Sequence, residues 1–388
     1  MKRFKFIDLF AGIGGFHQAM VQLGGQCVYA SEIDKFCIER YKENYNIDAD
    51  HDITKINPEE VPDHDVLCGG FPCQTFSKAG KQKGFEETRG TLFFYIEKIL
   101  QAKKPKYIVL ENVRNLVSHD NGNTWKVIRQ HIIDCGYRIT ENPIIMSPHQ
   151  LGIPQLRERV VILGVYDPDN TDKYLNIDLG TMKDKKDNSI ESILEPNNNE
   201  DKYKISKQEE RVLSAWDEFY KMIDLKVIGF PIIVDFFDGH IDPDYPNWKK
   251  QFVEKNHALY VLNKNAIDRW IKKWKVYETF TPTQRKMEWQ AGSSIESIWE
   301  GLIQFRPSGV RVKSPNCFPS LVAMVQVPIV GKYKRRLTIR EAARLQSFPD
   351  SFSFDSNDHQ AYKQFGNAVN VNVIKTAAEA LFNYKESE

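Results

Sequence analysis

The chain contains 388 residues, 41% of them hydrophobic, with a formal net charge of +1 at neutral pH. This length is enough to bury a full core and predicts two domains. The near-neutral charge excludes a general attraction to polyanions, so a nucleic-acid site must come from local clusters of basic residues. No apolar run is long enough to cross a membrane, and the opening residues, MKRFKFIDLF, show a strand pattern instead of a signal peptide. We therefore expect a cytoplasmic protein that does not contact membranes.

The six cysteines have no spacing typical of a metal site or a disulfide framework. The sequence has no C-x-x-C pair and no Cys/His cluster with the spacing of zinc ligands. Thiols in a cytoplasmic protein stay reduced. We expect no bound metal and no disulfide.

Short β-branched runs alternate with helical patterns from the start of the chain to about residue 165. This alternation predicts an α/β protein with a doubly wound, mostly parallel, Rossmann-like sheet. Ligands of such a sheet bind at the carboxyl ends of its strands. The expected strands are residues 4–9, 27–30, 65–68, 107–110 and 160–165, and the expected helices begin near 14 or span 35–44, 92–101 and 125–135.

The composition changes after residue 165. Residues 167–204 are rich in Asp, Asn and Lys, and the stretch LEPNNNEDK is typical of a surface linker or insertion. We predict a first domain over residues 1–185, completed by 355–388, and a second, smaller domain over 186–335. A helical segment, 336–354, would connect them.

Six of the seven tryptophans lie between Trp216 and Trp299, interleaved with basic residues as in WKKQF, RWIKKWKVY and TQRKMEW. They could form a small core with lysines in solvent around it, or they could lie on a surface that contacts phosphates. The two interpretations are compatible, and the sequence favours neither.

A Pro-Cys pair, Pro72–Cys73, follows the apolar run VLC and precedes a Gly- and Lys-rich segment. A thiol at a strand end can act as a nucleophile where nearby dipoles or cations lower its pKa. For an isolated Pro-Cys pair, a small buried hydrophobic side chain in a proline turn is the more common explanation. The other motifs must decide between these two interpretations.

A glycine turn, FIDLFAGIGGF, joins the first strand to its helix and would let the backbone approach a nucleotide-like ligand. His17 stands where a dinucleotide fingerprint requires its third glycine, which argues against NAD. Glu32 follows the second strand and could accept hydrogen bonds from a ribose diol, and Asp52 could bind an adenine amino group. Each acid alone could be a solvated loop carboxylate. Together, with no phosphate loop, they favour an adenosyl ligand without phosphates, S-adenosylmethionine.

Three further residues could carry chemistry at the same edge of the sheet. Glu111, in LENV, ends a strand, and a buried acid there could have a raised pKa and donate a proton to a ring nitrogen, or could simply cap a helix. Arg157 and Arg159, in QLRERVVILG, would point to one face at the period of a strand. They would bind an anion or a carbonyl oxygen, unless they only protect an edge strand.

These motifs, in this order, resemble those of the bacterial C5-cytosine DNA methyltransferases of restriction-modification systems. The resemblance covers most of residues 4–165 and 336–375. The region from about 168 to 335 matches only by its place, where the family carries a variable target-recognition domain. The blocks that carry the resemblance are FIDLFAGIGGF, GGFPCQTFS with KQKGFEETRGTLFF, LENV, QLRERVVILG, RLTIREAARLQSFPD and QFGNAVNVNV.

The resemblance implies a DNA (cytosine-5-)-methyltransferase in which the Cys73 thiolate adds to C6 of cytosine. Glu111 would contact N3 and the exocyclic amine, and Arg159, with Arg157 beside it, would hold the cytosine oxygen or the catalytic loop. The methyl group would come from S-adenosylmethionine, leaving S-adenosylhomocysteine. Ile33 stands where many relatives carry a tryptophan, so an aromatic contact to the adenine is not expected. The implied cofactor contacts are Phe10, Ala11, Gly12, Gly14, Glu32, Asp52, Pro72 and Asn367.

The resemblance also implies double-stranded DNA as the partner, with the target cytosine flipped out of the helix. The chain would act as a monomer and accompany a restriction endonuclease in function, without binding it. The loop from Gln74 to Leu92 would close over the DNA, hinged by glycines. Within it, the residues expected to contact DNA are Gln74, Ser77, Lys78, Lys81 and Arg89.

Two alternatives remain open at this point. One branch of the same family methylates cytosine in transfer RNA, although the large, tryptophan-rich middle region favours DNA. A catalytically silent DNA-binding module is the other alternative. The presence of Cys73, Glu111 and Arg159 together argues against it.

Overall fold

The computed structural model describes residues 3–72, 92–180, 188–198, 200–223, 228–321 and 326–384. The chain forms two compact units. The first unit comprises Met1–Asn188, Pro319–Met324 and Ala342–Glu388, and the second comprises Ser189–Phe318 and Val325–Glu341. The short segment Pro319–Met324 therefore belongs to the first unit, and the segment predicted to connect the domains is divided between the units after Glu341.

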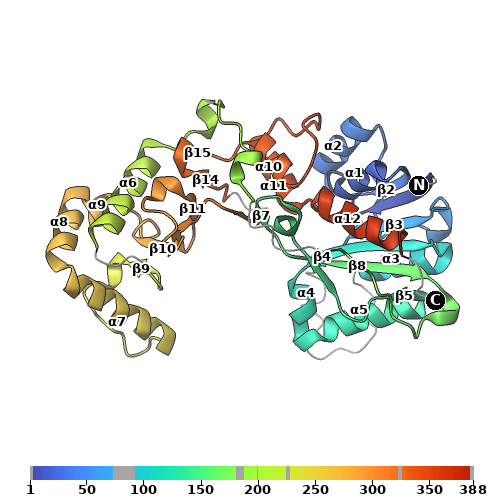
Figure 1. Cartoon of the computed structure of the whole chain (residues 1–388), viewed down its shortest axis with the longest axis horizontal. Coiled ribbons are helices and arrows are strands. Elements are labelled where there is room, and N and C mark those ends of the chain that lie inside the picture. Colours follow the sequence, from blue (N-terminus) through green and yellow to red (C-terminus); the bar gives the residue numbers. More distant parts are fainter. Residues whose placement is uncertain are drawn as a thin grey trace. The chain divides into compact units, whose positions relative to one another are not determined.

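A seven-stranded sheet forms the centre of the first unit, in the order β2-β1-β3-β4-β8-β5, with β6 paired to β8 (Figure 1). Neighbours among β1 to β4 are parallel, whereas β8 runs antiparallel to β4, β5 and β6. The central strands are apolar on both faces because helices cover both. The strands are β1 (Phe4–Leu9), β2 (Gly25–Ser31), β3 (Val66–Gly70), β4 (Tyr107–Val113), β5 (Tyr137–Ile139), β6 (Ile144–Met146) and β8 (Arg159–Tyr166).

The predicted α/β class is confirmed, and each of the five predicted strands lies within or beside an observed one. The sheet is more mixed than predicted, because β8 enters antiparallel to β4 and pairs with two further short strands. Strands β5 and β6 have three residues each, too few for their periodicity to be recognised in the sequence.

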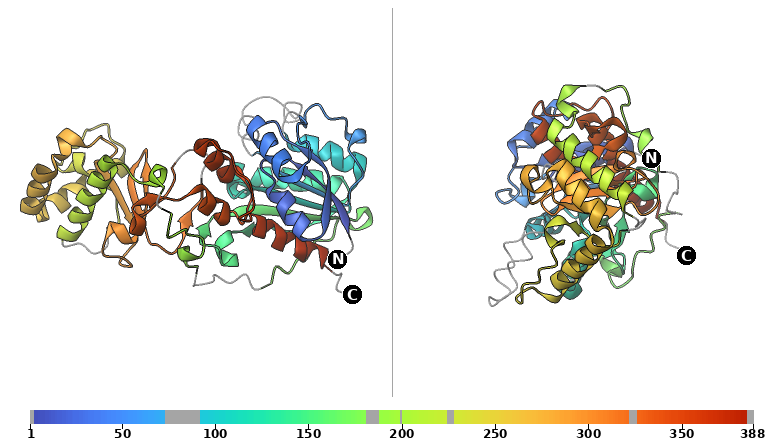
Figure 2. Two further views of the ribbon diagram at one scale, coloured as in Figure 1. Left: turned by 90° about the horizontal axis from the view of Figure 1, so that it is seen from above. Right: turned by 90° about the vertical axis from the view of Figure 1, so that its left-hand side faces the viewer.

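Helices pack on both faces of this sheet. Helices α1 and α12 lie side by side over one face (Figures 1 and 2), and the ring of Phe382 in α12 meets that of Phe4 in β1 at 5.2 Å. Helices α3 and α5 pack on the other face, where Phe93, Ile96 and Ile128 are buried against the strands. The helices are α1 (Gly15–Gln22), α2 (Lys35–Tyr45), α3 (Phe93–Lys103), α4 (Asn115–Ser118), α5 (Asn123–Asp134), α11 (Asp358–Asn367) and α12 (Val371–Phe382).

The second unit packs helices against a six-stranded sheet in the order β15-β14-β11-β12-β10-β9. Among the pairings described, β10 and β12 are parallel and the others are antiparallel. The strands are β9 (Ile232–Ile233), β10 (Lys286–Gln290), β11 (Leu302–Arg306), β12 (Gly309–Lys313), β14 (Ile329–Val330) and β15 (Arg335–Arg336). The helices are α6 (Lys207–Met222), α7 (Asn247–Leu262), α8 (Lys264–Trp274) and α9 (Val276–Thr279).

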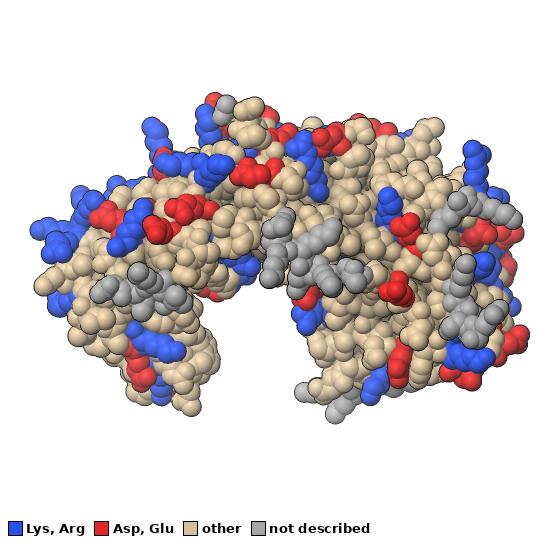
Figure 3. All heavy atoms as spheres, in the orientation of Figure 1, with Lys and Arg blue, Asp and Glu red and all other residues tan. Residues whose placement is uncertain are grey.

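The tryptophans of the second unit mostly form its core. Trp216, Trp270 and Trp289 are buried, and Trp274 and Trp299 pack partly buried against the same cluster. Only Trp248 among these six is largely exposed, at 61%. The core interpretation is thus confirmed for most of them, while Lys and Arg side chains gather on the surface over α8 (Figure 3).

Two short strands and one α-helix remain among the described strands and α-helices. Strand β7 (Gln155–Leu156) precedes β8, and β13 (Phe318–Pro319) lies where the chain passes from the second unit to the first. Helix α10 (Ile339–Leu345) begins in the second unit and ends in the first. No helix in the described part of the chain is long and apolar enough to cross a membrane.

Candidate active site

A cavity of about 340 Å³ lies at the carboxyl ends of the parallel strands of the first unit. The turn after β1, the segment after β2, the end of β3 and the turn after α11 all contribute to its walls. Residues from these distant parts of the sequence meet because parallel strands end at one edge of the sheet. Of the predicted cofactor residues, the cavity is lined by Phe10, Ala11, Gly12, Glu32, Asp52, Pro72 and Asn367.

Gly14 does not line the cavity but shapes the turn that does. Its φ of +85° is one that residues with a side chain rarely adopt, and an added Cβ would lie 2.6 Å from the Tyr45 hydroxyl. That hydroxyl lies 3.0 Å from the Ile13 carbonyl and 3.2 Å from the Gly14 carbonyl, and it donates to them. Tyr45 therefore holds the turn from behind, and its ring stacks on His17 at 3.8 Å. His17, which replaces the third glycine of a dinucleotide fingerprint, thus has a packing role.

Glu32 joins two segments of the cavity wall. Its Oε2 atom accepts a hydrogen bond from the Gly12 backbone at 2.8 Å, and its Oε1 atom accepts from the backbones of Ile33 and Asp34 at 2.8 and 2.9 Å. The Oε1 atom thus has both of its acceptor sites occupied, whereas the Oε2 atom keeps one lone pair for a ligand hydroxyl. Beside it, the Ile33 side chain is 70% exposed, so a ligand in the cavity would cover apolar surface there.

Asp52, which also lines the cavity, is held by its own loop. Its Oδ1 atom accepts hydrogen bonds from the Thr54 hydroxyl at 2.7 Å and the Thr54 backbone at 3.0 Å, and Lys55 lies 3.2 Å from Oδ2. These contacts, first the hydrogen bonds from Thr54, lower the pKa of Asp52. The side chain therefore stays ionised and can accept from an amino group.

The charges of the cavity decide which class of ligand fits it. The described residues that line it include four acids, Glu32, Asp34, Asp52 and Glu111, and no Lys or Arg. Phosphates would be repelled here, whereas they bind where cations and free backbone N–H groups converge. S-adenosylmethionine, which has a ribose diol, two positive charges and no phosphate, fits these donors and acceptors.

Glu111 stands at the end of β4, beside the cavity, and pairs with Arg159 at the start of β8. The Arg159 Nε atom lies 2.9 Å from the Glu111 Oε1 atom. Burial raises the pKa of Glu111, although the positive charges of Arg159 and Arg157 oppose this effect. Arg159 also donates through Nη1 to the Glu158 carbonyl, and its Nη2 has no hydrogen-bond partner among the described residues. The pair thus offers an acid that can hold a proton and a guanidinium with a free donor.

Arg157 lies differently from the prediction. The expectation that it shares a face with Arg159 assumed one continuous strand, but β7 ends at Leu156 and β8 begins only at Arg159. The Arg157 side chain is 3% exposed, and its Nη atoms donate to three backbone carbonyls at 3.0 to 3.1 Å. These Nη donors are therefore engaged by the protein itself.

Cys73 and the loop residues Gln74, Ser77, Lys78, Lys81 and Arg89 lie outside the described residues. The residue before them is placed: Pro72 lines the cavity, and the Asn112 amide donates to the Phe71 carbonyl at 2.8 Å. Asn112 follows Glu111, so one contact fixes the strand of the acid against the segment that leads to Cys73. The sequence motif LENV contains Asn112, but the sequence alone assigns no such contact to it.

The other cysteines are poor nucleophiles. Burial raises the pKa of each of the five that the structure describes, to about 12 for Cys27 and about 11 for Cys135 and Cys317, with Cys37 and Cys68 also raised. A thiol with a raised pKa carries little thiolate at neutral pH. If a cysteine of this chain acts as a nucleophile, Cys73 remains as the candidate.

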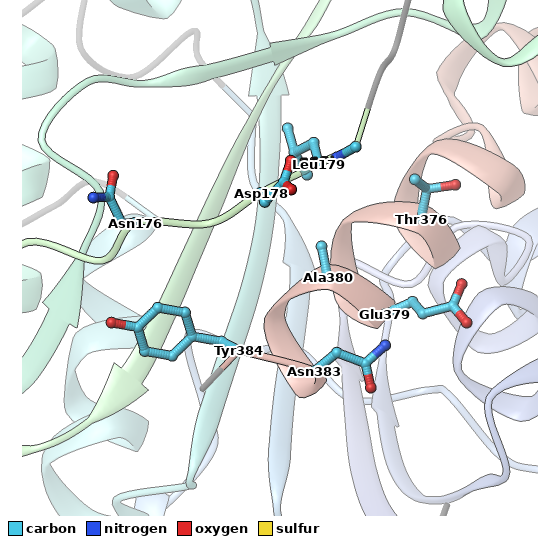
Figure 4. A pocket seen from close by; sticks show the side chains of 9 residues that line it. Asn176, Asp178, Leu179, Thr376, Glu379, Ala380, Asn383 and Tyr384 are labelled. Carbon is cyan, nitrogen blue, oxygen red and sulfur yellow. Dashed lines mark hydrogen bonds between the residues drawn. The ribbon is translucent and has the colours of Figure 1, made fainter. Parts of the chain in front are cut away.

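A second cavity, of about 380 Å³, lies between residues 176–180 and α12 (Figure 4). Figure 4 shows Asp178 on the extended segment and Glu379 on the helix, with the Glu379 carboxylate directed away from Asp178. Among the described residues that line it, there is no Cys, His, Lys or Arg. Across the described residues, no group of three or more His, Cys, Asp or Glu side chains could hold a metal ion.

Comparison with known proteins identifies the class to which this fold and site belong. The family model described as C-5 cytosine-specific DNA methylase matches residues 4–383. The chain therefore belongs to the C-5 cytosine-specific DNA methylase family.

Curated relatives match over nearly the whole chain. The Type II methyltransferase M.AluI of Cellulosimicrobium cellulans is 34% identical over 96% of this chain and 91% of its own length. M.NlaX of Neisseria lactamica is 35% identical over 97% and 96%, and M.HhaI of Haemophilus parahaemolyticus is 32% identical over 96% and 93%. Both are also named Type II methyltransferases.

Solved structures share the fold. A DNMT2 variant of Spodoptera frugiperda superposes with a TM-score of 0.56 at 20% identity, covering 98% of this chain and 99% of its own. A DNA modification methyltransferase, described as putative and encoded within an E. coli prophage, gives 0.52 at 19% identity, covering 98% of each chain. At these identities the likeness concerns the fold alone.

Proposed function

We propose that this protein is a DNA (cytosine-5-)-methyltransferase that acts on a cytosine flipped out of a specific short duplex sequence. The buried Glu111–Arg159 pair carries the proposal, because it lies beside a phosphate-excluding cavity and next to the segment that leads to Cys73. A role in a restriction-modification system, protecting host DNA in the bacterial cytoplasm, agrees with the names of the relatives. The partner restriction endonuclease would act separately, and the methyltransferase would act as a monomer.

The residues divide the reaction between them. The Cys73 thiolate adds to C6 of the cytosine, which makes C5 a carbon nucleophile. Protonated Glu111 donates to N3 and balances the charge that develops in the ring, while Arg159 donates to the cytosine carbonyl oxygen. Water then takes the C5 proton, and elimination of Cys73 releases 5-methylcytosine. S-adenosylmethionine, when bound, supplies the methyl group and leaves as S-adenosylhomocysteine.

The cavity would hold the cofactor through contacts on three sides. Glu32 would accept hydrogen bonds from the ribose diol, and Asp52 would accept from the adenine amino group. Phe10, Ile33 and Pro72 would cover its apolar surface, and the Ala11–Gly12 backbone and Asn367 would contact its polar atoms. Gly14 would act through the shape of the turn.

The remaining parts would bind DNA. The loop that follows Cys73 would contact the DNA backbone and fill the space that the flipped base leaves. Its expected DNA contacts are Gln74, Ser77, Lys78, Lys81 and Arg89. The second unit, which covers most of the predicted range 186–335 and extends to Glu341, would act as the target-recognition domain, and the segment 336–354 would connect it to the catalytic domain. Base specificity would come from side chains of that unit in the major groove.

A covalent trapping experiment tests the proposal. Duplex DNA with 5-fluorocytosine at the target should form a stable adduct with the protein in the presence of S-adenosylmethionine, because fluorine blocks the final elimination. The Cys73→Ser variant should form no adduct while it still binds S-adenosylmethionine. Bisulfite mapping of DNA from cells that express the chain identifies the target for this duplex. An adduct with RNA alone would identify an RNA methyltransferase, and DNA binding with neither adduct nor methylation would identify a silent DNA-binding module.

A further inference from the structure

The buried guanidinium of Arg157 connects three segments of the first unit. Its Nη1 atom donates to the Leu321 carbonyl at 3.1 Å, and its Nη2 atom donates to the carbonyls of Gly366 and Ala368, both at 3.0 Å. Its own backbone N–H donates to the Ser147 hydroxyl at 2.9 Å. Burial lowers the pKa of Arg157 to about 9, so the side chain remains charged at neutral pH.

Two of these carbonyls lie at the end of α11. The last carbonyls of a helix have no partner within the helix, and the helix dipole places partial negative charge there. A guanidinium supplies donors and positive charge at the same point. Arg157 therefore caps α11 from a position more than 200 residues earlier in the chain, since 209 residues separate it from Gly366.

The capped turn is a wall of the proposed cofactor cavity. Asn367, Ala368 and Val369 all line it. The turn also packs closely on α1, where a Cβ added to Gly15 would lie 2.8 Å from the Val369 carbonyl oxygen. The 366–369 turn therefore has little space to move toward α1, and the hydrogen bonds of Arg157 hold its carbonyls.

The carboxyl-terminal half of α11 is also tied to α2. Lys363 lies 3.0 Å from the Asp34 carboxylate, and the Gln364 amide donates to the Phe36 carbonyl at 3.2 Å. These contacts join α11 to the start of α2, and beyond the turn the Asn370 amide donates to the Leu345 carbonyl at 2.9 Å. None of them involves the carbonyls of Gly366 and Ala368, which Arg157 holds. The hydrogen bonds of Arg157 to Gly366 and Ala368 flank Asn367, so the position of this residue depends on Arg157.

From this geometry we infer that Arg157 is a positioning residue that preorganises the 366–369 wall of the cofactor cavity and does not touch the target base. This inference rests on the proposed function, because it assigns the cavity to S-adenosylmethionine. Arg157 then differs in role from Arg159, only two residues later, whose free Nη2 donor is available for the substrate.

The two roles predict different kinetic effects. Loss of a positioning contact weakens cofactor binding. The 366–369 turn would then become ordered only when the cofactor binds, and the entropy lost in ordering it reduces the binding free energy. A saturating cofactor concentration then restores most of the rate. Loss of a group that binds the cytosine lowers the rate even when the cofactor is saturating, so that kcat itself falls.

Cofactor affinity measured by calorimetry on the full chain tests the inference. Arg157→Met, which removes the donors at similar length, should raise the Kd for S-adenosylmethionine and S-adenosylhomocysteine about tenfold. The Kd of Arg157→Lys should lie between those of Arg157→Met and the wild type. The ammonium group of lysine keeps the charge, but it cannot donate to three carbonyls in the geometry of the planar guanidinium. In both variants, the KM for S-adenosylmethionine should rise more than kcat falls.

Arg138→Met is the matched control. Arg138 is 5% exposed in the same unit and donates to Asp167 at 3.0 Å and to the Lys173 carbonyl at 3.4 Å. Its loss should lower the melting temperature without changing the Kd. An unchanged Kd in Arg157→Met, or an equal rise in Arg138→Met, overturns the inference; if Arg157→Met does not fold, Arg157→Lys is held to the same comparison. If the wild-type chain itself binds neither cofactor nor product, the proposed function fails as well.

Discussion

The Glu111 carboxylate and the Arg159 guanidinium form a nearly buried pair, with Oε1 and Nε 2.9 Å apart. Their strands, β4 and β8, run antiparallel, with Val113 opposite Arg159 and Glu111 opposite Val161. The arginine therefore reaches back along the ladder to the acid. Burial and the arginine act on the acid in opposite directions, and burial is the larger effect, so the pKa of Glu111 is raised. An acid whose pKa is raised keeps its proton to higher pH than an ordinary glutamic acid, which suits it to proton donation.

Replacing Glu111 with glutamine should reduce methyl transfer by about a hundredfold or more, because the amide cannot protonate N3. The shape and most of the hydrogen-bonding capacity of the side chain are kept, so cofactor affinity should change little. Single-turnover rates at saturating S-adenosylmethionine measure the effect. Glu97→Gln is the control, since Glu97 is also a partly buried, paired acid, 3.0 Å from His131. Comparable rates in both variants would exclude a catalytic role for Glu111.

The pH dependence of the rate should show the influence of Arg159 on Glu111. The rate should fall as the pH rises through the raised pKa of Glu111, because the protonated form is the donor. Arg159→Met removes a charge that lowers this pKa. The alkaline limb should therefore move to higher pH, while the maximal rate falls through the lost contact with the cytosine oxygen. Arg159→Lys keeps the charge, so the pH at which its rate falls should stay nearer the wild-type value. If the rate of Arg159→Met falls at the same pH as that of the wild type, Arg159 does not influence the pKa of Glu111.

The parts of the site that the sequence predicts are those with strong local patterns. Short apolar segments precede the glycine turn, Glu32 and Asp52 in the sequence. Because parallel strands end at one edge of the sheet, these residues are expected to lie close together. Glu32 and Asp52 line one cavity, and the glycine turn forms part of its wall; we propose that this cavity binds the cofactor. Glu111 is found in the same way.

The parts that the sequence does not predict depend on contacts between distant segments. The Asp34–Lys363 pair joins residues 329 positions apart, and no local pattern indicates it. The period of a strand predicts Arg157 on the same face as Arg159, but residues 157 and 158 lie between β7 and β8. A break of two residues in a strand leaves no signal in hydrophobic periodicity.

Gly14 should be intolerant of a side chain for two separate reasons. Gly14→Ala would place a Cβ against the Tyr45 ring as well as forcing alanine to a φ of +85°. Gly24 provides the control, because its φ is +89° but nothing lies within 4 Å of an added Cβ. Gly24→Ala should cost about 1 kcal/mol of unfolding free energy from backbone strain alone. Gly14→Ala should cost clearly more and should also weaken cofactor binding; equal losses in urea denaturation would show that the Tyr45 contact is unimportant.

The buried ion pair of Arg335 and Glu341 should be a stability determinant of the second unit. The two side chains are 4% and 0% exposed, and two hydrogen bonds of 2.6 and 2.9 Å join them. Glu341 also accepts from the backbones of Thr338 at 2.7 Å and Glu195 at 2.6 Å, so it holds the segment around Glu195 against the start of α10. Removing one partner leaves the other charge buried and unpaired.

Glu341→Gln should therefore lower the unfolding free energy by about 3 kcal/mol, measured by urea denaturation. Asp268→Asn, which breaks the exposed Lys264–Asp268 pair on α8, should leave the unfolding free energy almost unchanged, because solvent screens this pair. Arg335→Met combined with Glu341→Leu should recover part of the loss, because it leaves no unpaired charge in the interior. The single variants Arg335→Met and Glu341→Leu are measured alongside the double variant. If the double variant loses as much unfolding free energy as the two single variants together, the backbone contacts of Glu341, and not the ion pair, stabilise this region.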